Sequence, residues 1–412
     1  MLKNVGILTF GTGISQGINL LGLLFLSRLY TPAEFGLYAV LLGVITIAGA
    51  ASSFRYEMTI LLPKSESKAS IATALSIITC LISNLLFLVV LLTLYAFGVV
   101  GVWWLIIPVA SIFTSFINIA AFLQNRNKQY LRIVAVQILK AITFILVAVI
   151  AGSYGATNYG LLLGLLFSVT LPAILIICFD FRIALSLAKK IEFSRLFAWG
   201  RIHRKFIYYS TPAVLANSLA SQAPVFLLTF FFGASLAGYY SMVQKVMMAP
   251  VTLVSGAVNK VYMQRISTLR ANRAEIFPFT FGILKKFVFP AIVIAVLMVT
   301  LFLMDSLEFI FGKKWLSIDN FALAMVPAFL FSFISKSISG FAILGRNELG
   351  LVYQVVLLIS ITLAIWLSYL IDLEGYEIFL MISATLLVCY VGQSSSILKI
   401  SKNLDSKIKS LR

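Results

Sequence analysis

Residues 71–95 read IATALSIITCLISNLLFLVVLLTLY, a run of 25 residues without one charged side chain. A transmembrane helix needs about 20 consecutive, mainly apolar residues. The run is therefore long enough to cross a bilayer, and it is continuous rather than alternating as the strands of a membrane barrel are. The sequence predicts a membrane-spanning helix here.

Similar stretches recur along the whole chain. Of its 412 residues 61% are hydrophobic and 11% are charged, and the mean hydropathy is +1.04. Soluble domains are about 45–50% apolar and about 25% charged, so we expect an all-α polytopic membrane protein. Twelve spans are predicted: 6–27, 38–62, 70–98, 103–124, 131–151, 157–179, 206–231, 237–259, 284–304, 320–344, 349–371 and 377–398.

The positive charge is distributed unevenly between the two sets of loops. The net charge is +18, and most of the 32 Lys and Arg fall in loops on one side, above all 180–205 and 260–286, and after Leu398. Cytoplasmic loops of membrane proteins carry such an excess. We therefore expect both termini in the cytoplasm and no nucleic-acid partner.

Several kinds of chemistry are not expected from this sequence. His203 is the one histidine, and the three cysteines, Cys80, Cys178 and Cys389, lie far apart within predicted helices. This spacing fits apolar packing and not a metal site. No glycine-rich loop ends in Gly-Lys-Ser/Thr, so we predict no metal, no bound cofactor and no ATP hydrolysis.

The chain repeats itself. Leu26–Tyr38 aligns with Leu228–Tyr240 at an offset of 202 residues, which places Gly36 opposite Gly238, and a second match pairs 123–131 with 343–351. Each match joins segments six helices apart, so the halves are parallel repeats, an arrangement that suits alternating access around a central cavity. The predicted parts are an N-terminal six-helix lobe (1–190), a basic linker (191–205), a C-terminal six-helix lobe (206–398) and a basic tail (399–412).

Five charged residues lie well inside predicted spans, away from the span ends, where charges usually face a cavity or a partner. We expect four of them to form a cationic lumen: Arg55, Lys140, Lys245 and Lys336. Polar residues at helical spacing accompany each cation, as Gln137 does Lys140. Snorkelling of these side chains to the surface is the alternative. Further candidates to line the lumen are Asn19, Asn118, Gln137 and Asn217, although hydrogen bonding between helices explains such residues equally well.

Glu57 is the one carboxylate in the middle of a predicted span. It lies two residues from Arg55, about 200° around an ideal helix, so we expect no same-face pair between them. As the sole mid-helix carboxylate, it is the candidate carrier of a coupled H⁺ or Na⁺.

Two motifs carry a resemblance to a known family. They are Ser27-Arg-Leu-Tyr-Thr-Pro-Ala-Glu-Phe-Gly-Leu-Tyr38 and Phe54-Arg-Tyr-Glu-Met-Thr-Ile-Leu-Leu-Pro63. The chain resembles the Wzx O-antigen flippases of the multidrug/oligosaccharidyl-lipid/polysaccharide exporter superfamily. The resemblance covers the whole chain in length, helix count and two-lobed repeat.

The resemblance implies a function in lipopolysaccharide synthesis. Such proteins move an undecaprenyl-diphosphate-linked oligosaccharide, such as an O-antigen repeat unit, across the bacterial inner membrane. Other polysaccharide-assembly membrane proteins are the implied partners, and no catalytic residue is implied. Of the five charged candidates, only Arg55 and Glu57 lie in the motifs. The prediction for Lys140, Lys245 and Lys336 depends on their position in the spans alone.

Three other functions stay open. An ion-coupled drug antiporter of the same superfamily would need acidic groups for its cationic substrates, and four cations against one carboxylate do not favour this. A membrane enzyme such as a sugar polymerase would be expected to carry a large outer loop with catalytic residues. A purely structural scaffold would not explain the cost of charges within the membrane.

Overall fold

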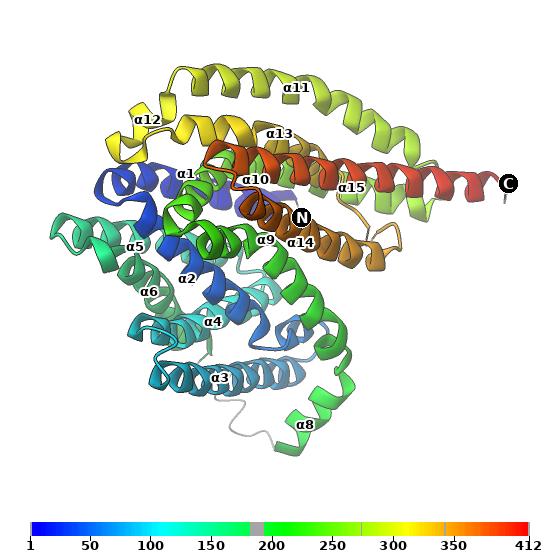
Figure 1. The fold of residues 1–412 in the computed structure, drawn as a ribbon. Helices are drawn as coiled ribbons and strands as arrows, with labels where there is room; N and C mark the ends of the chain where they lie inside the picture. The colour runs from blue at the N-terminus through cyan, green and yellow to red at the C-terminus, as the bar shows by residue number, and fades with distance from the viewer. Residues whose placement is uncertain (1, 182–192, 273, 342, 411–412) are drawn as a thin grey trace. The chain divides into compact units, whose positions relative to one another are not determined.

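The computed structural model describes residues 2–181, 193–272, 274–341 and 343–410, and within these ranges the chain forms helices and no strand (Figure 1). Twelve of the described helices are long and apolar enough to cross a membrane. The prediction of an all-α protein with twelve spans is confirmed.

The chain divides into two compact units. The first contains Met1–Tyr30 and Leu37–Leu219, and the second contains Thr31–Gly36 and Ala220–Arg412. The lobe limits expected from the sequence remain a prediction. The segment expected as a linker contains a helix, α8 (Phe193–Ile202), which packs against α3 of the first unit.

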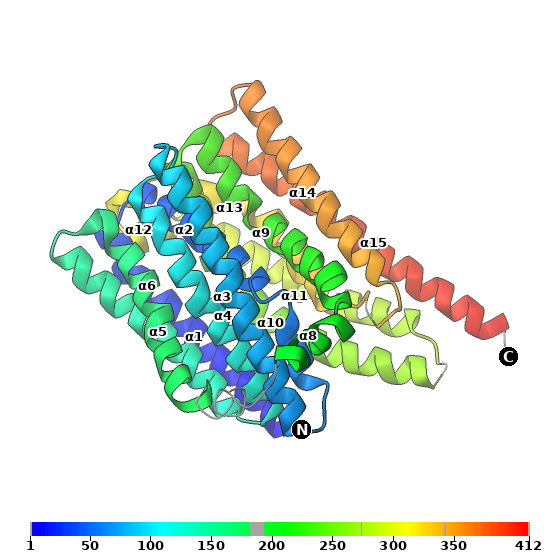
Figure 2. The same ribbon diagram turned by 90° about the horizontal axis from the view of Figure 1, so that it is seen from below.

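The first unit is built around helix pairs. Within it α5 packs against α1 and α6, and α4 packs against α3 and α6 (Figure 2). Its elements are α1 (Leu2–Leu29), α2 (Pro32–Ala51) from Leu37 onward, η1 (Tyr56–Leu61), α3 (Glu66–Ala96), η2 (Val102–Leu105), α4 (Ile106–Arg126), α5 (Tyr130–Ser153), α6 (Thr157–Ile176), η3 (Ile177–Phe181), α8, η4 (Phe206–Ser210) and α9 (Thr211–Phe232) as far as Leu219; the first residues of α2 belong to the second unit.

In the second unit α13 is the central helix and contacts α10, α11 and α15. Asp405 of α15 accepts hydrogen bonds from the backbone N–H groups of Ile276 (2.7 Å) and Phe277 (2.8 Å), which would otherwise be free at the start of α11. Helix α15 extends to Ser410, into the segment predicted as a tail. The elements are α10 (Ala234–Ala271), α11 (Phe277–Leu303), α12 (Ser306–Phe311), η5 (Lys313–Trp315), α13 (Ile318–Ser337), α14 (Asn347–Leu370) and α15 (Tyr376–Ser410).

The start of α2 follows from a capping box in the first motif. The carboxylate of Glu34 accepts hydrogen bonds from the backbone N–H (2.6 Å) and the hydroxyl (2.9 Å) of Thr31, and Pro32 occupies the first helical position. The residue before this capping box, Tyr30, is also held in place. Its buried hydroxyl donates to the carbonyl of Ala148 at 2.6 Å. The motif therefore sets where one helix ends and the next begins.

The second predicted span is too long. Helix α2 ends at Ala51, Phe54 and Arg55 have left-handed backbone angles (φ 49° and 61°), and a 3₁₀ helix, η1, follows. Ser52 and Ser53 come directly after α2, and serine side chains compete with the backbone for hydrogen bonds. The prediction of one continuous helix over 38–62 is wrong, as is the helical face expected to carry Arg55.

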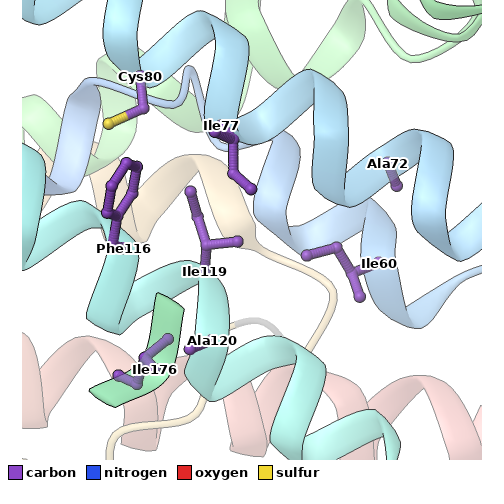
Figure 3. Close-up of a cluster of buried hydrophobic side chains, with 8 residues drawn as sticks. All are labelled: Ile60, Ala72, Ile77, Cys80, Phe116, Ile119, Ala120 and Ile176. Atoms are coloured by element: carbon purple, nitrogen blue, oxygen red, sulfur yellow. The ribbon is translucent and has the colours of Figure 1, made fainter. Parts of the chain in front are cut away.

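The 3₁₀ segment η1 is held by a hydrophobic cluster from four elements, η1, α3, α4 and α6 (Figure 3). Ile60 and Cys80 are fully buried in it, so the cysteine acts as a small apolar packing group, as predicted. The cluster consists of Ile60, Ala72, Ile77, Cys80, Phe116, Ile119, Ala120 and Ile176.

Candidate functional site

A cavity of about 290 Å³ lies inside the first unit and brings three of the predicted lumen residues together. Lys140 and Gln137 come from α5, and Asn19 comes from α1. Helices α2, α4 and α6 complete the wall. The remaining polar residues that line it are Ser15, Tyr38, Thr46, Thr114 and Ser168.

Lys140 supplies the charge of this cavity. No Asp or Glu is among the residues that line it, and no described residue forms an ion pair with the partly buried Lys140. The hydroxyls of Thr46, Thr114 and Ser168 donate to carbonyls of their own helices. An ammonium group in a membrane segment without a carboxylate has a strong electrostatic preference for an anion.

Arg55 and Glu57 form an ion pair of 3.0 Å between Nη1 and Oε1. The Glu57 side chain is 3% exposed, and the Ser53 hydroxyl also donates to it. The prediction that these two residues do not pair is wrong, because the left-handed backbone at Arg55 replaces the helix on which that prediction depended. Arg55 is therefore already neutralised within the protein.

Arg126 is a residue whose role the sequence did not reveal. Its guanidinium donates to the carbonyls of Ile60 (3.1 Å), Pro63 and Lys64 (3.2 Å), and pairs with Glu66 at 3.2 Å. It satisfies backbone carbonyls that no helix satisfies in this segment. Its place in the repeated 123–131 segment was the signal that could have indicated it.

Helix α8 packs on the same segment of the first unit. The Trp199 indole N–H donates to the hydroxyl of Thr59 (3.2 Å), and the Tyr56 hydroxyl donates to the carbonyl of Gly200 (3.1 Å). The His203 ring lies 4.5 Å from that of Trp199. The mid-chain helix and the second motif thus hold each other in place.

In the second unit the remaining two cations lie on neighbouring helices. Lys336 of α13 places its Nζ 3.3 Å from the sulfur of Met248 on α10, one turn after Lys245. The Lys245 ammonium lies 5.6 Å from the centre of the Phe35 ring, a cation–π distance. The Lys336 ammonium therefore lies close to the part of α10 that carries Lys245.

The other polar candidates do not gather with these groups. Asn118 is partly buried on α4, Asn217 is exposed on α9, and neither is among the residues that line the Lys140 cavity. Buried serines of α4 bond between helices instead, as Ser115 does with Ser52 and Ser111 with Asn84. For these serines, contact between helices is the better explanation.

Comparisons with known proteins indicate the family of the chain. A family model described as "Polysaccharide biosynthesis protein" matches residues 25–320. The chain belongs to this polysaccharide biosynthesis protein family. The matched region includes both motifs, Lys140 and Gln137, but neither Asn19 nor Lys336. No curated protein matches the chain.

Solved structures similar to this family member are membrane transporters. The lipid II flippase MurJ, in an inward closed conformation, has a TM-score of 0.70 at 14% identity, covering 97% of this chain and 90% of its own. An inward-facing multidrug resistance MATE family transporter has a TM-score of 0.69 at 12% identity, covering 97% and 96%. A MOP superfamily transporter from Pyrococcus furiosus Vc1 has a TM-score of 0.61 at 13% identity, covering 98% and 96%. The chain therefore has the same multi-pass fold as these transporters.

Proposed function

We propose that the protein is a flippase that moves an undecaprenyl-diphosphate-linked oligosaccharide, an O-antigen-like repeat unit, from the cytoplasmic to the periplasmic leaflet of a bacterial inner membrane. The observation that carries the proposal is the Lys140 cavity, whose lining contains a cation and no carboxylate. A diphosphate can occupy such a site, whereas a cationic drug is repelled by it.

A protein is needed because diphosphate and sugars cannot cross hydrocarbon without a large desolvation cost. Lys140 in the first unit offers a diphosphate a point charge with three donors, and Lys245 and Lys336 offer the same chemistry within the second unit. Asn19 and Gln137 supply amide groups beside Lys140 that fit sugar or phosphate oxygens. The membership in a polysaccharide biosynthesis family supports the sugar portion of this substrate.

The orientation and partners belong to the same proposal. The excess of Lys and Arg in one set of loops supports a cytoplasmic location of both termini. Net export then requires a sink outside, such as assembly proteins that use the delivered sugar, or a coupled ion. We propose Glu57 as the site of H⁺ or Na⁺ coupling, in which case the ion competes with the Arg55 guanidinium for one carboxylate.

The decisive test is translocation in proteoliposomes. A labelled undecaprenyl-diphosphate oligosaccharide is supplied in one leaflet, and an impermeant glycosidase measures how much reaches the other. Lys140→Ala should slow transport about tenfold or more, since hydrogen bonds to a charged group are worth about 1.5–3 kcal/mol. Lys140→Arg, which keeps the charge, should retain most of the rate.

Lys402→Ala is the control, because Lys402 is exposed near the end of α15 and should not affect transport. Equal rates for wild type and Lys140→Ala would refute the role of the cavity. A well-folded wild type that moves none of several lipid-linked sugars, under proton or sodium gradients, would favour the drug antiporter. Efflux of cationic drugs would then be measured.

A further inference from the structure

An apolar slot of about 70 Å³ lies within the second unit, between α10, α11 and α13. Every described residue that lines it is apolar. Ala291 and Phe329 are buried at its inner wall, whereas Val254 and Ile294 are 47% and 46% exposed. The slot is therefore open at one side, in the membrane-spanning part of these helices, and its chemistry suits hydrocarbon.

Prolines in all three helices explain why the slot is not closed by packing. Pro250 lines the slot, Pro290 precedes the lining residue Ala291, and Pro327 lies two residues before Phe329. A proline inside a helix removes a backbone hydrogen bond and bends the helix. The gap therefore depends on the backbones of all three helices. A change in the rotamer of one side chain would not close it.

One end of the slot is marked by an aromatic pair. Phe333 of α13 lines the slot, and its ring lies 5.8 Å from that of Phe287 on α11 at an interplanar angle of 70°. Phe287 is one helical turn from the lining residue Ala291. The pair therefore places neighbouring residues of α11 and α13 at the same end of the slot.

These neighbours are lysines. Lys336 follows Phe333 by one turn, and its Nζ contacts the sulfur of Met248, next to the lining residue Met247. The exposed Lys285 and Lys286 directly precede Phe287 on α11. The positive charge at this end is not cancelled, since neither α11 nor this end of α13 contains a carboxylate.

Two carboxylates lie near the start of α11, Asp405 of α15 and the exposed Glu275, which comes ten residues before Lys285. Asp405 is occupied by the backbone N–H groups of Ile276 and Phe277, more than two turns before Lys285. The slot therefore has an apolar body and a cationic end, in the order that a lipid with a phosphate headgroup presents them.

We propose that the slot binds a short section of the hydrocarbon chain of the polyprenyl-phosphate lipid, with its phosphate at Lys336 and at the Lys285–Lys286 pair. The choice of lipid rests on the proposed function. What is new is the place where the hydrocarbon chain of that lipid is held. An apolar wall recognises the hydrocarbon chain by van der Waals packing, because no burial from water is gained within the bilayer, and the lysines recognise the phosphate by charge. The sugars would remain outside the slot, which is too small and too apolar for them.

The test uses two adjacent positions with nearly equal exposure. Ile294 lines the slot and is 46% exposed, whereas Val293 is 50% exposed and does not line it. Binding of tritiated undecaprenyl phosphate to the full-length protein in nanodiscs is measured by scintillation proximity. Ile294→Trp should weaken binding about tenfold by filling the mouth of the slot, and Val293→Trp should stay within about twofold of wild type.

Two further measurements separate the chain from the headgroup. Lys336→Gln should weaken binding of undecaprenyl phosphate several-fold and leave competition by undecaprenol unchanged. Val254→Trp, on the opposite side of the mouth, repeats the block from α10. All variants are compared at matched thermal stability.

The proposal is overturned if Ile294→Trp and Val293→Trp bind equally, if the wild type binds no undecaprenyl phosphate, or if phosphatidylglycerol competes as well as the polyprenyl lipid. The last result would make the slot a site for bulk lipid. These outcomes are independent of the translocation assay: failure of wild-type transport counts against the proposed function, whereas normal binding by Ile294→Trp counts against the slot alone.

Discussion

Two glycines of the internal repeat approach each other so closely that neither tolerates a methyl group. A Cβ at Gly36 would lie 1.9 Å from the carbonyl oxygen of Ala234, and a Cβ at Gly238 would lie 1.8 Å from that of Pro32. All four residues belong to the second unit. The obstacles are backbone atoms, which cannot rotate away as a flexible side chain can.

The cost of Gly238→Ala follows from this distance. To accept the methyl group the first turns of α2 and α10 must separate by more than about 1 Å, and a gap of 0.5–1 Å already loses about a quarter to a half of the dispersion energy across a contact. Overpacking usually costs about 1–3 kcal/mol, and we expect about 3 kcal/mol because backbone must move.

Gly256→Ala is the matched control on the same helix. A Cβ at Gly256 meets nothing within 4 Å, so alanine should stabilise α10 by about 0.5–1 kcal/mol. In a fluorescence-detected thermal assay of the detergent-solubilised protein, Gly238→Ala should melt roughly 5 °C or more below Gly256→Ala. The double variant Gly36→Ala/Gly238→Ala should cost less than the sum of the two singles, because one separation relieves both clashes. Equal melting of Gly238→Ala and Gly256→Ala would refute the close packing.

Three further outcomes are expected. Glu57→Gln should lower stability by about 3 kcal/mol by leaving Arg55 without its partner, and Arg55→Gln/Glu57→Gln should recover part of the loss in a thermal double-mutant cycle; additive effects would contradict the pair. Tyr30→Phe should cost about 1–3 kcal/mol, since the carbonyl of Ala148 loses its buried donor, and an unchanged melting temperature would contradict that bond. Burial lowers the pKa of His203, so the unfolded chain binds the proton first. Packing of α8 should therefore weaken as the pH falls below about 6.5, as seen by hydrogen exchange, and His203→Asn should remove this dependence.

The spans could be predicted because membrane helices are selected by a property that local sequence carries. A run such as residues 71–95 satisfies length and apolarity without reference to any other part of the chain. The end of α2 could not be predicted in this way. Its break depends on partners distant in sequence, since Arg126 and Trp199 supply the hydrogen bonds that stabilise η1.

The site was predictable in part for the same reason. Lys140, Gln137 and Asn19 meet in one cavity because polar residues within apolar helices are forced inward, which periodicity alone indicates. The pairing of Arg55 with Glu57 was missed because an ideal helix was assumed where the backbone is left-handed. Lys336 was predicted as a lumen cation, whereas Lys285 and Lys286 were not singled out, because they are significant only beside a cavity between three helices.

The repeat itself has a physical explanation in the glycine contact. Residues 36 and 234 meet, residues 238 and 32 meet, and shifting each residue by 202 positions converts one contact into the other. The first turns of α2 and α10 are therefore related by a local two-fold rotation, in which each glycine faces its own counterpart. A residue on such an axis packs against its own counterpart. A substitution at either position must therefore be accommodated by the other. Arg126 and Arg346 are also counterparts in the repeat, but their contacts differ: Arg126 donates to backbone carbonyls of the first unit, and Arg346 forms an exposed pair with Glu348. The similarity between the halves should thus persist at the contact and fade away from it.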